Sequence, residues 1–174
     1  MIEWNQKKNK WKLGELVVLP RTNTQIKECR TSYEQMVGSR YICIREASDG
    51  KQGILLKVIG KLPQYQIKVV AGEPFCKDDK LEGFDGDAYY SYRFPTTDEV
   101  KEVLGILREN KELLDVFEKA SMHINPYSTF WVRETVSKLF FLKTPQYFDS
   151  KNDVVLPSTG DDREFNYRIT IAYF

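Results

Sequence analysis

The stretch Phe165-Asn-Tyr-Arg-Ile-Thr-Ile-Ala-Tyr173 decides the fold. Large apolar or aromatic side chains occupy every second position and alternate with Asn166, Arg168, Thr170 and Ala172. A period of two is that of a β-strand, in which successive side chains point to opposite faces of the sheet. We therefore expect a strand over 165–173 that pairs inside a sheet.

Shorter apolar runs predict further strands in the first half of the chain, over 13–19, 41–44, 54–59, 65–69 and 89–94. The runs at 41–44, 54–59 and 65–69 are separated by short turns and predict a meander. One of these turns is Ser48-Asp49-Gly50, since glycine easily adopts the positive φ of a tight hairpin. The acidic segment 76–87 contains two glycines and is expected to be a surface loop.

Helical spacing begins at Thr96. The sequence Thr96-Thr97-Asp98-Glu99 fits a capping box, in which the cap hydroxyl and a glutamate satisfy the free N–H groups of the first turn. Apolar residues then recur at helical spacing to Leu107 and, after Asn110, to Phe117, which predicts two helices. A third helix is predicted from 125 or 128 to about 142, ended by Pro145, with a loop over 149–164.

This order of elements favours an α+β fold, because strands and helices are segregated rather than alternating. We expect a single domain over 1–174 that is β-rich at 1–95 and helical at 96–143, with a loop and the C-terminal strand at 144–174. An antiparallel sheet of about five or six strands, made of the N-terminal meander and the C-terminal strand, is expected to pack against about three helices.

Composition places the protein among globular chains, with 41% hydrophobic and 29% charged residues. The sequence shows no signal peptide and no apolar run long enough to span a bilayer, so no membrane partner is expected. Cys29, Cys43 and Cys76 are odd in number and widely spaced, which is typical of thiols in a reducing compartment. We therefore expect a cytoplasmic protein.

The charge is unevenly distributed along the chain. Residues 1–72 hold 13 lysines and arginines against 6 acidic residues, whereas residues 73–174 hold 13 against 19. Two interpretations follow. The halves neutralise one another within a fold or across a dimer, or the basic half faces a polyanion.

Catalytic, metal and cofactor signatures are absent from the sequence. Any mechanism that needs an imidazole has only His123, and no nucleophile motif surrounds a cysteine. The expected role of His123 is to cap backbone groups between two helices. Zinc spacings are missing, and the acidic loop from Asp78 fails the calcium-loop register with Lys80 at the third position. Nucleotide-binding glycine motifs do not occur. We expect no catalytic residue, no metal and no cofactor, and an enzyme is the less favoured class.

Two groups of residues are candidate binding sites. The first mixes cations with aromatic rings, as surfaces that bind single-stranded nucleic acid do, and consists of Trp4, Lys7, Lys8, Lys10, Trp11 and Lys12. Its alternative is an amphipathic lead-in whose tryptophans pack on the sheet. The second is a candidate small-ligand pocket made of Tyr90, Tyr92, His123, Asn125, Trp131 and Arg133.

Three stretches, Ala120-Ser-Met-His-Ile-Asn-Pro-Tyr-Ser-Thr-Phe-Trp-Val132, Lys143-Thr-Pro-Gln-Tyr-Phe-Asp149 and Tyr92-Arg-Phe-Pro-Thr-Thr97, resemble a family of small proteins of unknown function from gut bacteria, often carried on mobile elements. The resemblance covers residues 83–150. It implies an accessory protein and transfers no functional residue.

Three functions are consistent with the sequence. The first is a non-catalytic interaction or accessory protein with an unknown protein partner or self-interface. The second is nucleic-acid binding through the basic half, and the third is an enzyme or small-ligand binder with an unrecognised site.

Overall fold

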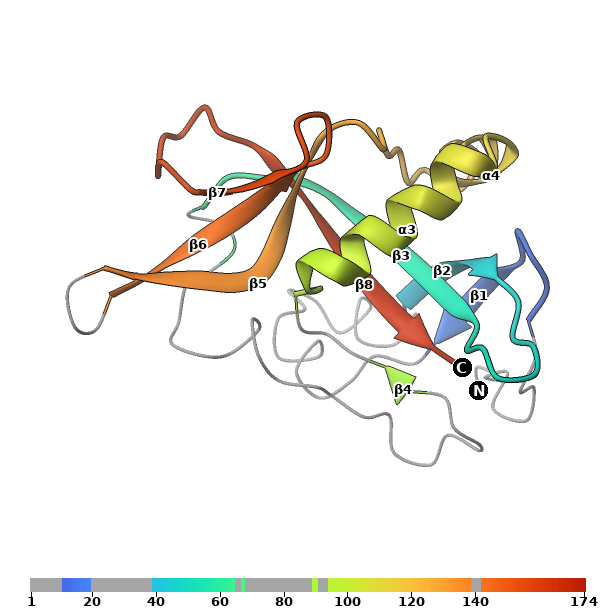
Figure 1. Ribbon diagram of the computed structural model, residues 1–174. Coiled ribbons are helices and arrows are strands. Elements are labelled where there is room, and N and C mark those ends of the chain that lie inside the picture. Colours follow the sequence, from blue (N-terminus) through green and yellow to red (C-terminus); the bar gives the residue numbers. More distant parts are fainter. Residues whose placement is uncertain (1–10, 20–38, 65–66, 68–88, 91–93, 139–141) are drawn as a thin grey trace. The chain divides into compact units, whose positions relative to one another are not determined.

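The computed structural model describes residues 11–19, 39–64, 67, 89–90, 94–138 and 142–174 (Figure 1). Its strands are β1 (Leu16–Leu19), β2 (Ser39–Arg45), β3 (Ile54–Leu62), β4 (Tyr89–Tyr90), β5 (Thr129–Lys138), β6 (Leu142–Asp149), β7 (Val154–Pro157) and β8 (Asn166–Tyr173). The helices among these residues are α3 (Thr97–Glu109) and α4 (Glu112–Lys119). None of the described helices has the length and apolar character needed to cross a membrane.

The sheet is mixed and not antiparallel, which corrects the expected fold. Its strand order is β1-β2-β3-β8-β5-β6-β7, and β4 pairs with β8 in addition. The pairs β1 with β2, β2 with β3, β5 with β6 and β6 with β7 are antiparallel, whereas β5 and β8 are parallel, with Phe130 opposite Tyr167. The reason lies in the path of the chain. After β5 it forms β6 and β7, and it then forms β8, which lies beside β5 and runs in the same direction.

The expectation of three helices is also wrong. The predicted third helix is replaced by β5, which pairs with β6 in a long hairpin (Figure 1). Phe130 stacks on Tyr167 at 5.2 Å, and the next residue, Trp131, packs edge-on to Tyr147. Since neighbouring strand residues point to opposite faces, this strand is buried on both, and such a strand is apolar without clean alternation. The apolar residues of β5 therefore happen to recur at helical spacing.

Two smaller expectations fail in the same region. Pro145, predicted to end a helix, lies in β6 opposite Thr135, where the register between β5 and β6 shifts. Proline is tolerated at such irregularities because it has no N–H to donate to the ladder. The predicted loop over 149–164 contains the strand β7. The predicted strand at 65–69, apart from Ile67, and the acidic loop at 76–87 lie outside the described residues.

The chain divides into two compact units. One comprises Met1–Lys57, Asp78–Tyr92 and Ile171–Phe174, and the other Val58–Lys77 and Arg93–Thr170. The core of the first unit gathers Trp11, Val17, Leu19, Tyr41, Cys43, Leu55, Ala172 and Phe174. Gly53 is required there, because a Cβ at this position would lie 2.2 Å from the Phe174 ring.

In the second unit, α3 begins at the predicted capping box. The Thr96 hydroxyl accepts a hydrogen bond from the Glu99 N–H, and the Glu99 carboxylate accepts one from the Thr96 N–H. The apolar stripe of α3 is buried, and the helix packs against β5. On β8 the polar residues Asn166, Arg168 and Thr170 are buried as well, so the alternation of this strand does not mark a solvent face.

Candidate functional site

A pocket of about 430 Å³ opens in the second unit. It is lined by residues 58–61 of β3, by Ser121, Met122, His123 and Asn125 just after α4, and by Tyr167 of β8. This volume falls in the range of about 300–1,000 Å³ that is usual for small-molecule sites.

Gly60 shapes the β3 side of this pocket. Its φ of 138° lies in the region that favours glycine, and no atom lies within 4 Å of the place where a Cβ would stand. Next to this glycine the burial along β3 changes, from Val58, which is buried, to Ile59 and Lys61, which are exposed. The strand predicted over 54–59 ended just before Gly60, whereas β3 continues through it to Leu62.

The end of α4 shapes the opposite side. The Met122 N–H donates to the Phe117 carbonyl over 2.8 Å, and the Ser121 N–H donates to the Glu118 carbonyl over 3.0 Å. This is the Schellman pattern, which turns the chain at a residue with left-handed backbone. Ser121 has that backbone, with φ of 59°, at the position where glycine is the usual residue. Backbone groups therefore cap the helix, and the capping role expected for His123 is not observed.

Tyr167 connects these two sides of the pocket. The Lys61 ammonium lies over its ring, 5.1 Å from the centroid. Its hydroxyl accepts a hydrogen bond from the Asn125 N–H over 3.2 Å. The Asn125 side-chain oxygen accepts a further bond from the Tyr127 N–H, so this asparagine holds the loop after α4 in a tight turn. The loop that carries His123 is thus fixed at both of its ends.

The structure brings together only part of the predicted pocket. His123 and Asn125 line the observed one. Trp131 is fully buried, and its indole N–H donates to the Leu62 carbonyl over 2.8 Å. Arg133 donates its backbone N–H to the Pro95 carbonyl. Tyr90 belongs to β4, and Tyr92 lies outside the described residues. Lys61, Ser121 and Tyr167 also line the pocket and were not predicted as site residues, because no local motif marks them.

The proposed nucleic-acid cluster is described only at its end. Trp11 is 1% exposed and packs edge-on against Phe174 at 4.8 Å, so its indole offers no face on which a base can stack. Lys12 is exposed. The other members, Trp4, Lys7, Lys8 and Lys10, lie outside the described residues.

Two further places, Cys43 and the loop after β7, contain reactive or charged side chains. Cys43 is buried, and burial raises the pKa of its thiol to about 12, so the nucleophilic thiolate is not formed near neutral pH. No group of metal-ligating side chains occurs within the described part of the chain.

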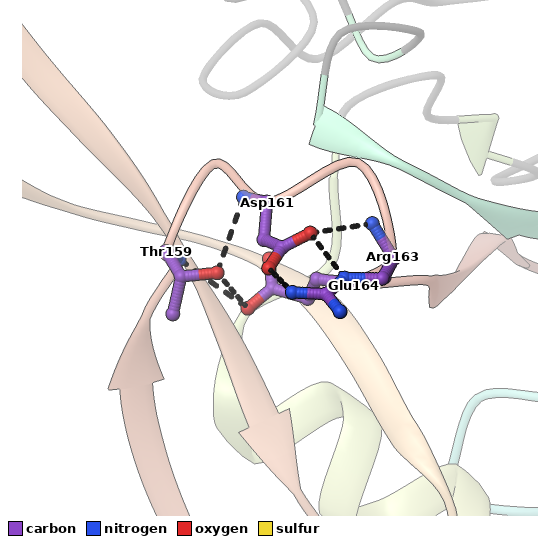
Figure 2. A network of polar contacts seen from close by, with 4 residues as sticks. All are labelled: Thr159, Asp161, Arg163 and Glu164. Atoms are coloured by element: carbon purple, nitrogen blue, oxygen red, sulfur yellow. Dashed lines mark hydrogen bonds and ion pairs between the residues drawn. The ribbon is translucent and has the colours of Figure 1, made fainter.

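The second feature is the loop after β7, where charged and hydroxyl side chains form a network (Figure 2). The Arg163 guanidinium donates to both Asp161 carboxylate oxygens and lowers the pKa of that carboxyl group. The Asp161 N–H donates to the Thr159 hydroxyl, and the Ser158 hydroxyl donates to Glu164 over 2.6 Å. These bonds satisfy one another within a tight turn, so the network stabilises the loop.

No protein-family model, curated protein or solved structure matches the chain. The resemblance over residues 83–150 therefore stays a prediction.

Proposed function

We propose that the protein is a non-catalytic accessory protein that binds a small molecule in the pocket between β3 and the loop after α4. The observation that carries this proposal is Ser121. A residue other than glycine in left-handed backbone costs about 1–2 kcal/mol, and strain of this kind gathers at functional sites. Here the strained residue, φ 59°, lines the pocket. The presence of a serine where the backbone favours glycine supports a role for its hydroxyl.

Binding rather than catalysis is supported by the surroundings of His123. An imidazole that acts as a base is usually oriented by a carboxylate and paired with a nucleophile. In the part of the chain that the structure describes, neither a carboxylate nor a thiol lines the pocket. Lys61, His123, Ser121 and Asn125 instead provide the few polar groups that orient a ligand in a partly apolar site.

Ligand-observed NMR with a library of neutral, anionic and cationic fragments tests this proposal on the full chain. Each hit is measured again with Ile59→Trp, which narrows the pocket from an exposed position, 43% accessible. Leu156→Trp is the matched control, because Leu156 is an aliphatic strand residue of similar exposure, 38%, and does not line the pocket. We expect hits that Ile59→Trp abolishes and Leu156→Trp preserves. Hits that bind both variants equally, or a library without hits, contradict the proposal.

A further inference from the structure

Each polar side chain that lines the pocket has a hydrogen-bond donor available, although the Ser121 hydroxyl and the His123 imidazole can also accept. Lys61 forms no ion pair with a described residue, and its ammonium group has three N–H donors and no acceptor. Asn125 has both kinds of group, but the Tyr127 N–H occupies its side-chain oxygen over 3.0 Å. An N–H can only donate, so this contact fixes the amide orientation and leaves the Asn125 NH2 group free to donate.

Tyr167 adds to the same pattern. Its hydroxyl oxygen accepts from the Asn125 N–H, which leaves the phenolic proton to be donated. The Ser121 hydroxyl and the His123 imidazole also line the pocket, and each has a proton to donate. Five lining side chains, those of Lys61, Ser121, His123, Asn125 and Tyr167, thus have a proton to donate.

The charges around the pocket also favour a ligand with a negatively charged group. Among the described residues, those that line the pocket include one lysine and one histidine and no aspartate or glutamate. The C-terminal end of α4, which carries negative partial charge, directly precedes the lining residues Ser121 and Met122. Its carbonyls at Phe117 and Glu118 are already occupied by the Met122 and Ser121 N–H groups, so their lone pairs are partly neutralised.

Apolar surface completes the pocket. Val58, Ile59 and Met122 line it together with the polar groups, and Ile59 is the most exposed of the three. A ligand that fills the pocket therefore needs an apolar body beside its polar group.

From these contacts we propose that the ligand is a small oxyanion, a carboxylate or a phosphate monoester, with an apolar body. The anionic group binds to Lys61, Ser121 and His123, and the body lies against Ile59. This inference rests on the proposed function, since it specifies the ligand of the same pocket.

Calorimetric titration of the full chain at low salt tests the inference with benzoate, phenyl phosphate and benzamide, the last being the neutral counterpart of benzoate. We expect at least one anion to bind about tenfold more tightly than benzamide, because hydrogen bonds to charged groups are the stronger ones. Lys61→Gln and His123→Gln are expected to weaken anion binding about tenfold and to leave benzamide unchanged. Lys151→Gln, at an exposed lysine that does not line the pocket, is the control.

The outcomes separate the two proposals. Benzamide binding as tightly as benzoate and phenyl phosphate, or anion binding that is unaffected by Lys61→Gln, overturns the oxyanion inference and leaves the pocket as a binding site. If all fragment hits are neutral or cationic and are lost in Ile59→Trp, the oxyanion inference is likewise overturned and the pocket remains a binding site. If no compound of any charge binds in a way that Ile59→Trp abolishes, the proposed function itself fails.

Discussion

Ser121 is the residue at which stability and function are expected to conflict. Its φ of 59° is costly for any side chain with a Cβ and is free of strain for glycine. Ser121→Gly should therefore raise the free energy of unfolding by about 1 kcal/mol while weakening ligand binding. Denaturant titration measures the first effect and ligand titration the second.

Asp153 is a matched control. Among the described residues it is the other non-glycine residue with a positive φ, which is 53°. Asp153 does not line the pocket, and its ion pair with Lys101 is solvent-exposed and so contributes little. Asp153→Gly should stabilise the protein without changing ligand affinity. Equal effects of the two variants on affinity would contradict the assigned role of Ser121.

Cys43 makes a prediction about alkaline pH. The pKa of its thiol is raised from 9.0 to about 12, because burial disfavours the thiolate. The unfolded state therefore loses this proton first, and the stabilising contribution, complete below pH 9, disappears as the pH rises through about 12. Between about pH 7.5 and about pH 10.5 the wild type should lose about 2 kcal/mol more stability than Cys43→Ala. Urea unfolding at the two pH values measures this difference, and identical losses would show that folding does not raise the pKa of the Cys43 thiol.

At the scale of single elements, α3 depends on its first turn. Thr96→Ala removes the acceptor for the Glu99 N–H, whose distance from the hydroxyl oxygen is 3.2 Å, and should lower the free energy of unfolding by about 1 kcal/mol. Thr96→Ser keeps the hydroxyl and should change stability by less than half as much. Thermal unfolding followed by circular dichroism compares the two, and an equal loss in both variants would argue against the cap.

The elements also show what local sequence can predict. The capping box and the apolar stripe of α3 are local features, with their signal contained within one or two turns, and both are confirmed. The identity of β5 is decided by residues distant in sequence, since Tyr167 covers Phe130 and Tyr147 covers Trp131. The residues close to 130 in the sequence do not indicate that Tyr147 and Tyr167 will cover this strand. A helix was predicted there for this reason.

The candidate site likewise combines residues that local sequence can indicate with residues that it cannot. His123 and Asn125 were selected from one unusual local stretch and do line the pocket. Lys61 and Tyr167 come from strands that are far apart in the sequence and meet at the loop after α4. Their role depends on the strand order, in which β8 lies between β3 and β5, and alternation within a strand does not determine that order.

At the scale of the whole molecule, β7 is the last strand in the order of the sheet. The Ser158 N–H donates to the Pro145 carbonyl, so by alternation residues 154 and 156 face β6 with their N–H groups and residues 155 and 157 face outward. Residue 157 is proline, which removes one of these outward donors. Proline on an edge strand is a common protection against pairing with another chain.

Pro157→Val restores the outward donor beside Leu156, whose side chain is exposed, and should increase self-association. Size-exclusion chromatography with light scattering across a range of protein concentrations measures it. Val154→Lys in the Pro157→Val background should reverse the effect, since a charged side chain disfavours edge pairing. A Pro157→Val protein with the same mass distribution as the wild type would show that this edge is blocked by other means.

The central claim is that the pocket formed by residues 58–61, the loop after α4 and Tyr167 is the place where a ligand binds. Its most direct test is a titration of the isotopically labelled full chain with phenyl phosphate, followed by backbone amide resonances in two-dimensional NMR. The structure predicts saturable shifts at Ile59, Gly60, Lys61, Ser121 and His123. Saturable shifts confined to other residues, with these five unmoved, would contradict it.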